Sequence, residues 1–167
     1  MKLYTTEGAP NPRRVRIFLA EKNIEVPMCE LSIMKQEHKT DEYRSISPFS
    51  RVPALVLDDE SVLLESVAIC KYFEYLHPEP ALFGKTNMEK VLIEMQNRKM
   101  ELELLMTVAG AFRHTHPAFS GLENQNKDFG LVQKENAEKR LKYLDRELAD
   151  KQYIAGSSYS IADITCL

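Results

Sequence analysis

The sequence predicts a chain in two parts, a mixed α/β part followed by an all-helical part. Up to about residue 78, short apolar segments of strand length alternate with helical patterns, in the order β–α–β and then β–β–α. The segment 77–80 contains two prolines, which end any regular element. After it, apolar residues recur only at helical spacing. We therefore expect an α/β domain at 1–78, a linker at 79–86 and an all-helical domain at 87–167.

The chain opens with a predicted strand, turn and helix. Residues 3–5 are short and apolar enough for a strand. After a loop, Val15, Phe18 and Leu19 have the i, i+3, i+4 spacing of an apolar helix face. Because Asn favours the N-cap and Pro the first helical position, we expect Asn11 to cap this helix and Pro12 to begin it.

The rest of the first domain supplies three more strands and a helix. Residues 25–31 predict a strand near a sheet edge, because Pro27 lacks the N–H that a central strand needs. A polar segment with one short helix follows. Residues 52–57 and 61–64 flank an acidic turn, which indicates a hairpin. Ser66 is expected to cap the next helix, whose inward face carries Val67, Ile69, Cys70, Phe73 and Leu76.

The second domain is predicted to contain two long helices and the start of another. Thr86 and Glu89 have the spacing of a capping box in front of the first. Its predicted inward residues are Leu92, Met95, Leu102, Leu105, Met106 and Ala109. The second runs from about 129 to 149, with Leu131, Ala137, Leu141, Leu144 and Leu148 inward. Ser160 and Asp163 indicate a further capped helix, and the sequence ends inside it.

The composition is that of an ordinary globular protein. Of 167 residues, 44% are hydrophobic and 28% are charged. The net charge of −3 argues against nucleic acid as a partner, because phosphate binding needs a concentrated basic surface. No apolar run approaches the length of a membrane span, and the N-terminus lacks the apolar core of a secretory signal. We therefore expect a cytoplasmic protein without a membrane partner.

Cysteine and histidine usage predicts neither disulfides nor a metal site. Cys29, Cys70 and Cys166 are an odd number at long spacings, which fits a reducing compartment. A Cys-x-x-Cys motif does not occur. His114 and His116 are too close in sequence to share one helix face.

Four segments, in register along the whole chain, resemble motifs of the glutathione transferase family. They are Ala9-Pro10-Asn11-Pro12 after the first strand, Arg51-Val52-Pro53-Ala54-Leu55 before the third strand, Leu64-Glu65-Ser66-Val67-Ala68-Ile69 at a helix start, and Ser160-x-x-Asp163. The resemblance implies a thioredoxin-like N-terminal domain followed by a helical-bundle domain, and glutathione as co-substrate. It also implies a homodimer, and further helices after residue 167, so that the sequence is expected to be incomplete.

The resemblance implies a role for two motifs in holding glutathione. Glu65 would accept from the ammonium of the γ-glutamyl group, and Ser66 would donate to its carboxylate at a positive helix end. The alternative is that Ser66 only caps the helix. Pro53 is expected in the cis form, so that the backbone of Val52 pairs with the cysteinyl amide like an added strand. An ordinary trans proline that opens a strand is the alternative.

The polar segment before the third strand is where the family supplies cations for the glycyl carboxylate. His38 and Lys39 are preferred for this role, with Lys35 nearby, and Ser50 is expected to line the same end. The alternative is a solvated, charged loop.

The catalytic position is where the sequence departs from the family. Its members ionise the glutathione thiol with Tyr, Ser or Cys in the first strand or the following turn, but this turn carries Ala9. Asn11 is expected to replace them by donating its amide to the thiolate, unless it only caps the helix. Thr6 is a secondary donor. His114 and Ser120 in the helical domain are further candidates, with a polar pair facing a loop as the alternative.

The expected function is conjugation of the glutathione thiolate to a small hydrophobic electrophile held between the domains. Met106, Phe112 and Phe119 are expected to line that pocket. Two alternatives stay open, a glutathione-dependent disulfide or peroxide reductase and a non-catalytic transferase-like module that binds other proteins.

Overall fold

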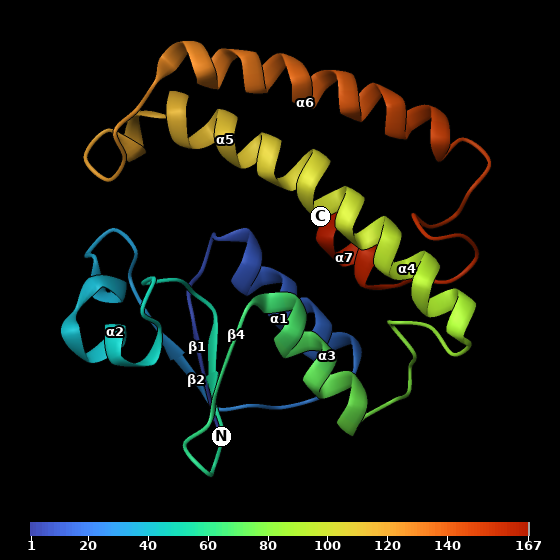
Figure 1. Ribbon diagram of the computed structural model, residues 1–167, viewed down its shortest axis with the longest axis horizontal. Coiled ribbons are helices and arrows are strands. Elements are labelled where there is room, and N and C mark those ends of the chain that lie inside the picture. Colours follow the sequence, from blue (N-terminus) through green and yellow to red (C-terminus); the bar gives the residue numbers. More distant parts are fainter. Residues whose placement is uncertain (167) are drawn as a thin grey trace. The chain divides into compact units, whose positions relative to one another are not determined.

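The computed structural model describes residues 1–166, and its backbone forms two compact units, Met1–Ala81 and Leu82 to the C-terminus (Figure 1). The first contains a four-stranded sheet with helices, and the second contains helices without a ladder of strands among its described residues. The predicted fold class, an α/β part followed by an all-helical part, is confirmed.

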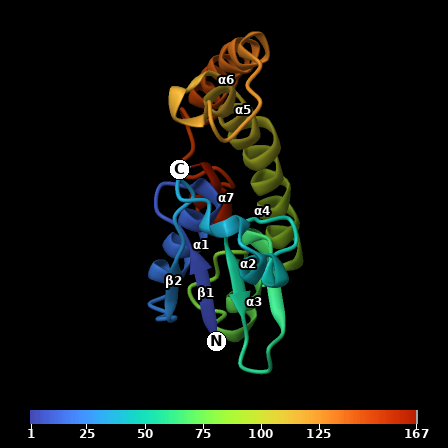
Figure 2. The same ribbon diagram turned by 90° about the vertical axis from the view of Figure 1, so that its left-hand side faces the viewer.

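The sheet of the first unit has the order β2-β1-β3-β4. The strands are β1 (Lys2–Thr5), β2 (Met28–Glu30), β3 (Ala54–Val56) and β4 (Val62–Leu64). β2 pairs parallel with β1, beside which it lies in Figure 2, and the other pairs are antiparallel. β2 is at the edge, as Pro27 predicts.

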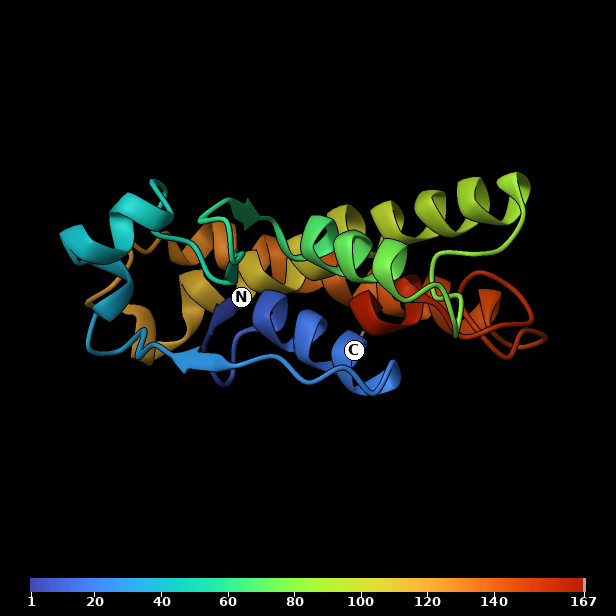
Figure 3. The same cartoon turned by 90° about the horizontal axis from the view of Figure 1, so that it is seen from below.

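The core of this unit lies between the sheet and two helices, α1 (Pro10–Glu21) and α3 (Ser66–Leu76). The two helices lie side by side (Figure 3). Their buried faces are apolar, and the fully covered side chains include Leu3, Val15, Phe18, Leu19, Leu55, Ile69, Cys70 and Phe73. Leu76 is wrong as a predicted core residue, because it lies in the last turn of α3 and is 51% exposed.

Both helices begin one or two residues away from the predicted positions. α1 begins at Pro10, with Ala9 at the N-cap, so Asn11 lies inside the first turn and does not cap it. Pro10 can take the first helical position because the N–H that it lacks would have no partner there. α3 begins at Ser66, with Glu65 at the N-cap, so Ser66 is the first helical residue and not the cap.

The segment between β2 and β3 is short and irregular. A 3₁₀ turn, η1 (Glu37–Lys39), precedes α2 (Asp41–Ile46), and the Thr40 side chain accepts a hydrogen bond from the Tyr43 N–H to cap α2. This confirms the short helix predicted in the polar segment.

The second unit is built on a long helical run and a helical hairpin. Its elements are α4 (Asn87–Lys99), the π-helical turn η2 (Met100–Leu105), α5 (Met106–Thr115), the 3₁₀ turn η3 (Pro117–Phe119), α6 (Lys127–Glu147) and α7 (Ile161–Cys166). Thr86 and Glu89 form the predicted capping box of α4. None of the helices within residues 1–166 has the length and apolar character needed to cross a membrane.

α5 and α6 pack closely at one glycine (Figure 1). A Cβ atom built on Gly130 would lie 2.6 Å from Cγ2 of Thr115 and 2.9 Å from Cβ of His114. Both distances are shorter than real Cβ contacts, so the packing of this hairpin requires a residue without a side chain.

The buried face of the long helical run differs from the predicted one. Leu92, Met95, Leu102 and Met106 were expected inward but are 42–58% exposed, and Leu131 and Leu141 of α6 are also exposed. The buried residues of this run are instead Ile93, Asn97, Met100, Leu104 and Thr107. Apolar residues occur on both faces of the run, and the buried face also carries Asn97 and Thr107, so periodicity alone favours the wrong face. Oδ1 of the buried Asn97 accepts a hydrogen bond from the hydroxyl of Thr165 of α7 at 2.5 Å, whereas its Nδ2 has no hydrogen-bond partner among residues 1–166.

Candidate active site

The strand register brings three chain segments to one edge of the sheet in the first unit. Tyr4 near the end of β1 pairs with Ala54 at the start of β3, and Ala54 pairs with Leu64 at the end of β4. The turn after β1, the residues before β3 and the residues after β4 therefore meet at the same edge. These are the segments that carry the first three motifs.

The residues before β3 leave one backbone unit free. The Val52–Pro53 peptide is cis, as expected, and Pro53 is buried. The carbonyl of Arg51 accepts from the Tyr43 hydroxyl at 2.6 Å and from Ser47 Oγ at 2.9 Å, which fixes the approach to Val52. Within residues 1–166, neither the N–H nor the C=O of Val52 has a hydrogen-bond partner. An extended peptide could pair with both groups.

The tyrosine in this arrangement is held as a neutral donor. Burial raises the pKa of Tyr43 to about 12. Its hydroxyl therefore keeps its proton at neutral pH and donates to the Arg51 carbonyl.

The residues after β4 place a strained residue at a helix end. Glu65 has φ 66° and ψ 117°, an unusual conformation for a residue with a side chain. Ser66, which is 4% exposed, follows as the first residue of α3. The first N–H groups of a helix have no partner within it and carry partial positive charge. This end of α3 therefore suits a carboxylate.

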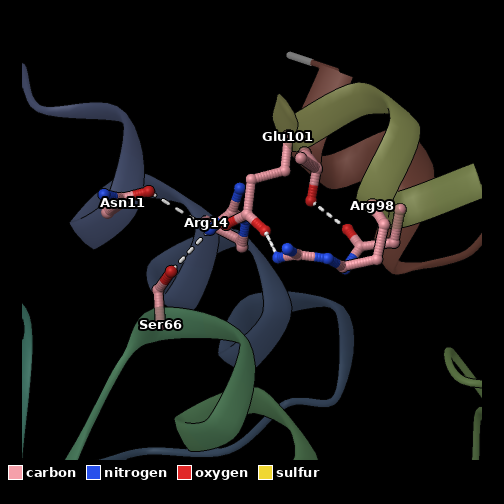
Figure 4. A network of polar contacts seen from close by, with 7 residues as sticks. Asn11, Arg14, Ser66, Arg98 and Glu101 are labelled. Atoms are coloured by element: carbon pink, nitrogen blue, oxygen red, sulfur yellow. Dashed lines mark hydrogen bonds and ion pairs between the residues drawn. The ribbon is translucent and has the colours of Figure 1, made fainter. Parts of the chain in front are cut away.

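A buried arginine connects the turn after β1 with the start of α3. Arg14 of α1 is 2% exposed, and its Nη1 donates to Oδ1 of Asn11 at 3.1 Å and to Oγ of Ser66 at 2.5 Å (Figure 4). The structure therefore brings Asn11 and Ser66 together through a residue that the sequence analysis missed. A cation directly beside Val15 on an apolar helix face was the signal that could have found it.

The threonine of the turn is one of the residues that line a cleft. Thr6 is 5% exposed, and its hydroxyl makes only a long hydrogen bond of 3.5 Å to the carbonyl of Glu7. The cleft has a volume of about 460 Å³ and is lined by Thr6, Glu7 and the residues 30–35 and 37. Thr6 thus borders a cleft that a ligand could enter.

The segment before β3 places the positive charges of Lys39 and Arg51 near His38. His38 lies in η1 and is 8% exposed, and its Nδ1 has no hydrogen-bond partner within the described chain. Burial, together with the charges of Lys39 and Arg51, lowers the pKa of His38 below its usual value. Ser50 has φ 54°, and its hydroxyl accepts a long bond of 3.4 Å from Nε of Arg44. The positive charges around His38 favour an anion.

The two candidates from the second unit have structural partners there. Nδ1 of His114 accepts from the backbone N–H of Asn126 at 3.0 Å, and its ring packs edge-on against Phe129. Ser120 is exposed in the turn after η3, where its N–H donates to the carbonyl of Pro117. His114, in the last turn of α5, and Ser120, after η3, thus have hydrogen-bond partners within the second unit, and their catalytic role stays a prediction.

Two of the three cysteines, Cys70 and Cys166, are not poised as nucleophiles. All three are free thiols. Burial raises the pKa of Cys70, and burial also raises the pKa of Cys166, so both thiols stay protonated at neutral pH. Over residues 1–166 the His, Cys, Asp and Glu side chains form no group of three that could hold a metal ion.

Comparison with known sequences gives one consistent result. A profile of the N-terminal domain of glutathione S-transferases matches residues 3–81. Glutathione S-transferase 2 of Saccharomyces cerevisiae is 40% identical over 171 aligned residues, which cover 100% of this chain and 73% of that protein.

Solved structures agree with the sequence comparison. A glutathione S-transferase domain-containing protein of Marinobacter aquaeolei has a TM-score of 0.93 and 38% identity, over 99% of this chain and 83% of that one. Gtt2 of Saccharomyces cerevisiae has a TM-score of 0.92 and 41% identity, over 99% of this chain and 82% of that one. With 40% identity across its whole length to a curated transferase, the chain belongs to the glutathione S-transferase family.

Proposed function

We propose that the protein is a cytoplasmic, homodimeric enzyme that conjugates glutathione to small hydrophobic electrophiles. The observation that carries this proposal is the meeting of three complementary groups at one sheet edge: the free backbone of Val52, the start of α3 at Ser66 and the side chain of Asn11. In a chain of this family, these groups match the parts of one γ-glutamyl tripeptide.

The domain at 1–78 is proposed to bind glutathione along its whole length. Ser66 donates to the carboxylate of the γ-glutamyl end, and Glu65 accepts from its ammonium. The N–H and C=O of Val52 pair with the cysteinyl amide beside cis Pro53. Lys39 attracts the glycyl carboxylate through its positive charge, and His38 and Ser50 contribute to the same binding site.

Catalysis is proposed to rest on stabilising the thiolate. The thiolate is the nucleophile, so a group that favours it over the thiol raises its concentration at neutral pH. The amide of Asn11 donates to the sulfur, with Thr6 as a second donor and the N-terminus of α1 adding its positive end. His114 and Ser120 of the helical domain are proposed to assist. The sulfur then bonds to the electrophilic carbon, and the leaving group departs with its electron pair.

The direct test is binding followed by turnover. The purified protein is titrated with glutathione by calorimetry and assayed for conjugation with a chlorodinitrobenzene. We expect saturable binding and conjugation, both weakened at least tenfold by Ser66→Ala because a hydrogen bond to a charged group is lost. Ser61→Ala, in the exposed hairpin turn at the opposite end of β3 and β4, is the matched control and should change neither.

Other outcomes point to the other functions. Turnover of mixed disulfides or peroxides without conjugation of the aryl halide indicates a glutathione-dependent reductase. A folded protein that binds no glutathione indicates a module whose fold serves protein contacts.

A further inference from the structure

Arg14 is a charged side chain in the interior of the first unit. It is 2% exposed, and its neighbours on the same helix face, Val15 and Phe18, are fully buried. Removing a guanidinium from water is unfavourable unless hydrogen bonds and negative charge replace the water. An apolar residue would fill the same position on α1 without that penalty, so the contacts of Arg14 explain its presence better than packing does.

Two of these contacts are made by one terminal amino group. Nη1 donates one hydrogen bond to Oδ1 of Asn11, which lies one helical turn earlier. It donates a second to Oγ of Ser66, which is 52 residues away in sequence (Figure 4). A guanidinium has donors only. Both partners must therefore present an oxygen acceptor to Arg14.

This fixes the hydrogen-bond direction at Ser66. A serine hydroxyl has one hydrogen, and Oγ of Ser66 is an acceptor toward Arg14 at 2.5 Å. Its hydrogen therefore points away from Arg14 and is available to a carboxylate at the start of α3. Without Arg14, the hydroxyl could rotate and turn its lone pairs toward the ligand.

The same reasoning applies to Asn11. Its carbonyl oxygen is taken by Arg14, so the amide NH₂, which carries the two donors, lies on the other side of the group. An amide that is free to flip could also turn its oxygen toward an anion, which is unfavourable. Arg14 therefore removes the unfavourable orientation at both residues.

We propose that Arg14 is a positioning residue that sets Ser66 to donate to the γ-glutamyl carboxylate and Asn11 to donate to the sulfur. This inference rests on the proposed function. Arg14 touches neither group of the ligand in this scheme and acts through the two residues that do.

The test combines Arg14→Met with each partner variant in a double-mutant cycle. Calorimetry gives the affinity for glutathione, and the ultraviolet absorbance of the bound thiolate against pH gives the pKa of the bound thiol. We expect Arg14→Met to weaken binding about tenfold and to raise that pKa. In a Ser66→Ala background the same change should weaken binding about twofold or less, and in an Asn11→Ala background it should leave the thiol pKa unchanged.

Two further variants separate positioning from folding. Arg146→Met, at an exposed position of α6 in the second unit, removes an arginine whose Nε donates to the carbonyl of Lys142, and it should alter neither readout. Arg14→Lys keeps the charge and the length of the side chain, so it covers the case in which Arg14→Met does not fold. Because an ammonium lacks the planar geometry of the guanidinium, Arg14→Lys should show the same losses in reduced size.

The outcomes distinguish this inference from the proposed function. If wild type binds and conjugates glutathione, but Arg14→Met or Arg14→Lys weakens binding equally in the wild-type and Ser66→Ala backgrounds, Arg14 is only structural and the inference is wrong. If wild type binds no glutathione, the proposed function fails and the inference fails with it.

Discussion

Replacing Lys22 by methionine is expected to destabilise the protein by several kcal/mol. Lys22 follows the end of α1, and its charged group is fully buried. Nζ forms an ion pair with Glu74 at 2.7 Å and donates to the carbonyls of His77 at 2.6 Å and Pro80 at 2.7 Å. One ammonium group thus joins α1 to the last turn of α3 and to the chain that follows it.

The expected loss in the free energy of unfolding comes from the carboxylate of Glu74, which the substitution leaves without the ammonium of Lys22. The side chain of Glu74 is 9% exposed, so losing its cation leaves a carboxylate in a poorly hydrated place. Breaking a buried ion pair from one side costs about 3–5 kcal/mol. The two carbonyls contribute little to this figure, because His77 and Pro80 are exposed and water can replace the lysine there.

Urea unfolding followed by circular dichroism measures the effect. Lys22→Met is compared with the double variant Lys22→Met/Glu74→Leu, which removes the carboxylate as well. Because an apolar pair carries no desolvation penalty, we expect the double variant to recover to within about 2 kcal/mol of wild type. Lys90→Met, at an exposed position of α4, is the control and should change stability by less than about 0.5 kcal/mol. Equal losses in the single and double variants would refute the reasoning, because the charge left behind would then not matter.

Three other changes test the second unit and the pH dependence. Asp163→Ala removes the acceptor of three hydrogen bonds, which come from two backbone N–H groups and one hydroxyl. It should lower the free energy of unfolding by about 1–3 kcal/mol, measured by thermal unfolding. An unchanged unfolding midpoint would contradict the capping role of Asp163. Gly130→Ala should destabilise the α5–α6 hairpin by about 1–3 kcal/mol, whereas Gly121→Ala, with open space around it, should not. The lowered pKa of His38 means that the unfolded chain binds the proton more readily, so stability should fall as pH drops below about 6.5. His38→Gln should reduce that fall, and an unchanged pH profile would show that His38 is not its source.

Features that depend on neighbours in sequence could be predicted. The order of elements along the first unit, the edge position of β2, the hairpin and the capping box of α4 follow from local patterns of apolar residues, prolines and capping side chains. The buried stripe of the long helical run did not follow, because the choice between two apolar faces is made by packing with distant segments. Asn97 is the clearest case, since its burial depends on Thr165 of α7.

In the candidate site, too, some residues could be predicted from local sequence and one depends on a distant segment. Val52, Pro53, Glu65 and Ser66 could be named because each belongs to a short motif that can be recognised in the sequence alone. Arg14 was missed because its hydrogen bond to Ser66 joins residues 52 positions apart. The sequence of α1 shows a cation on an apolar face but does not identify its partner.

The wrong expectation about Asn11 bears on its proposed role. The side-chain oxygen of an Asn at the N-cap accepts hydrogen bonds from the first N–H groups of its own helix. The helix end then sets the orientation of the side-chain amide. α1 instead begins at Pro10, and the oxygen of Asn11 accepts from Arg14. The amide is therefore oriented by a residue that also holds Ser66, so the groups proposed for the two ends of the γ-glutamyl-cysteinyl unit are set by one guanidinium. A cap would have made Asn11 independent of Ser66, whereas this arrangement predicts that changes at the two residues are coupled through Arg14.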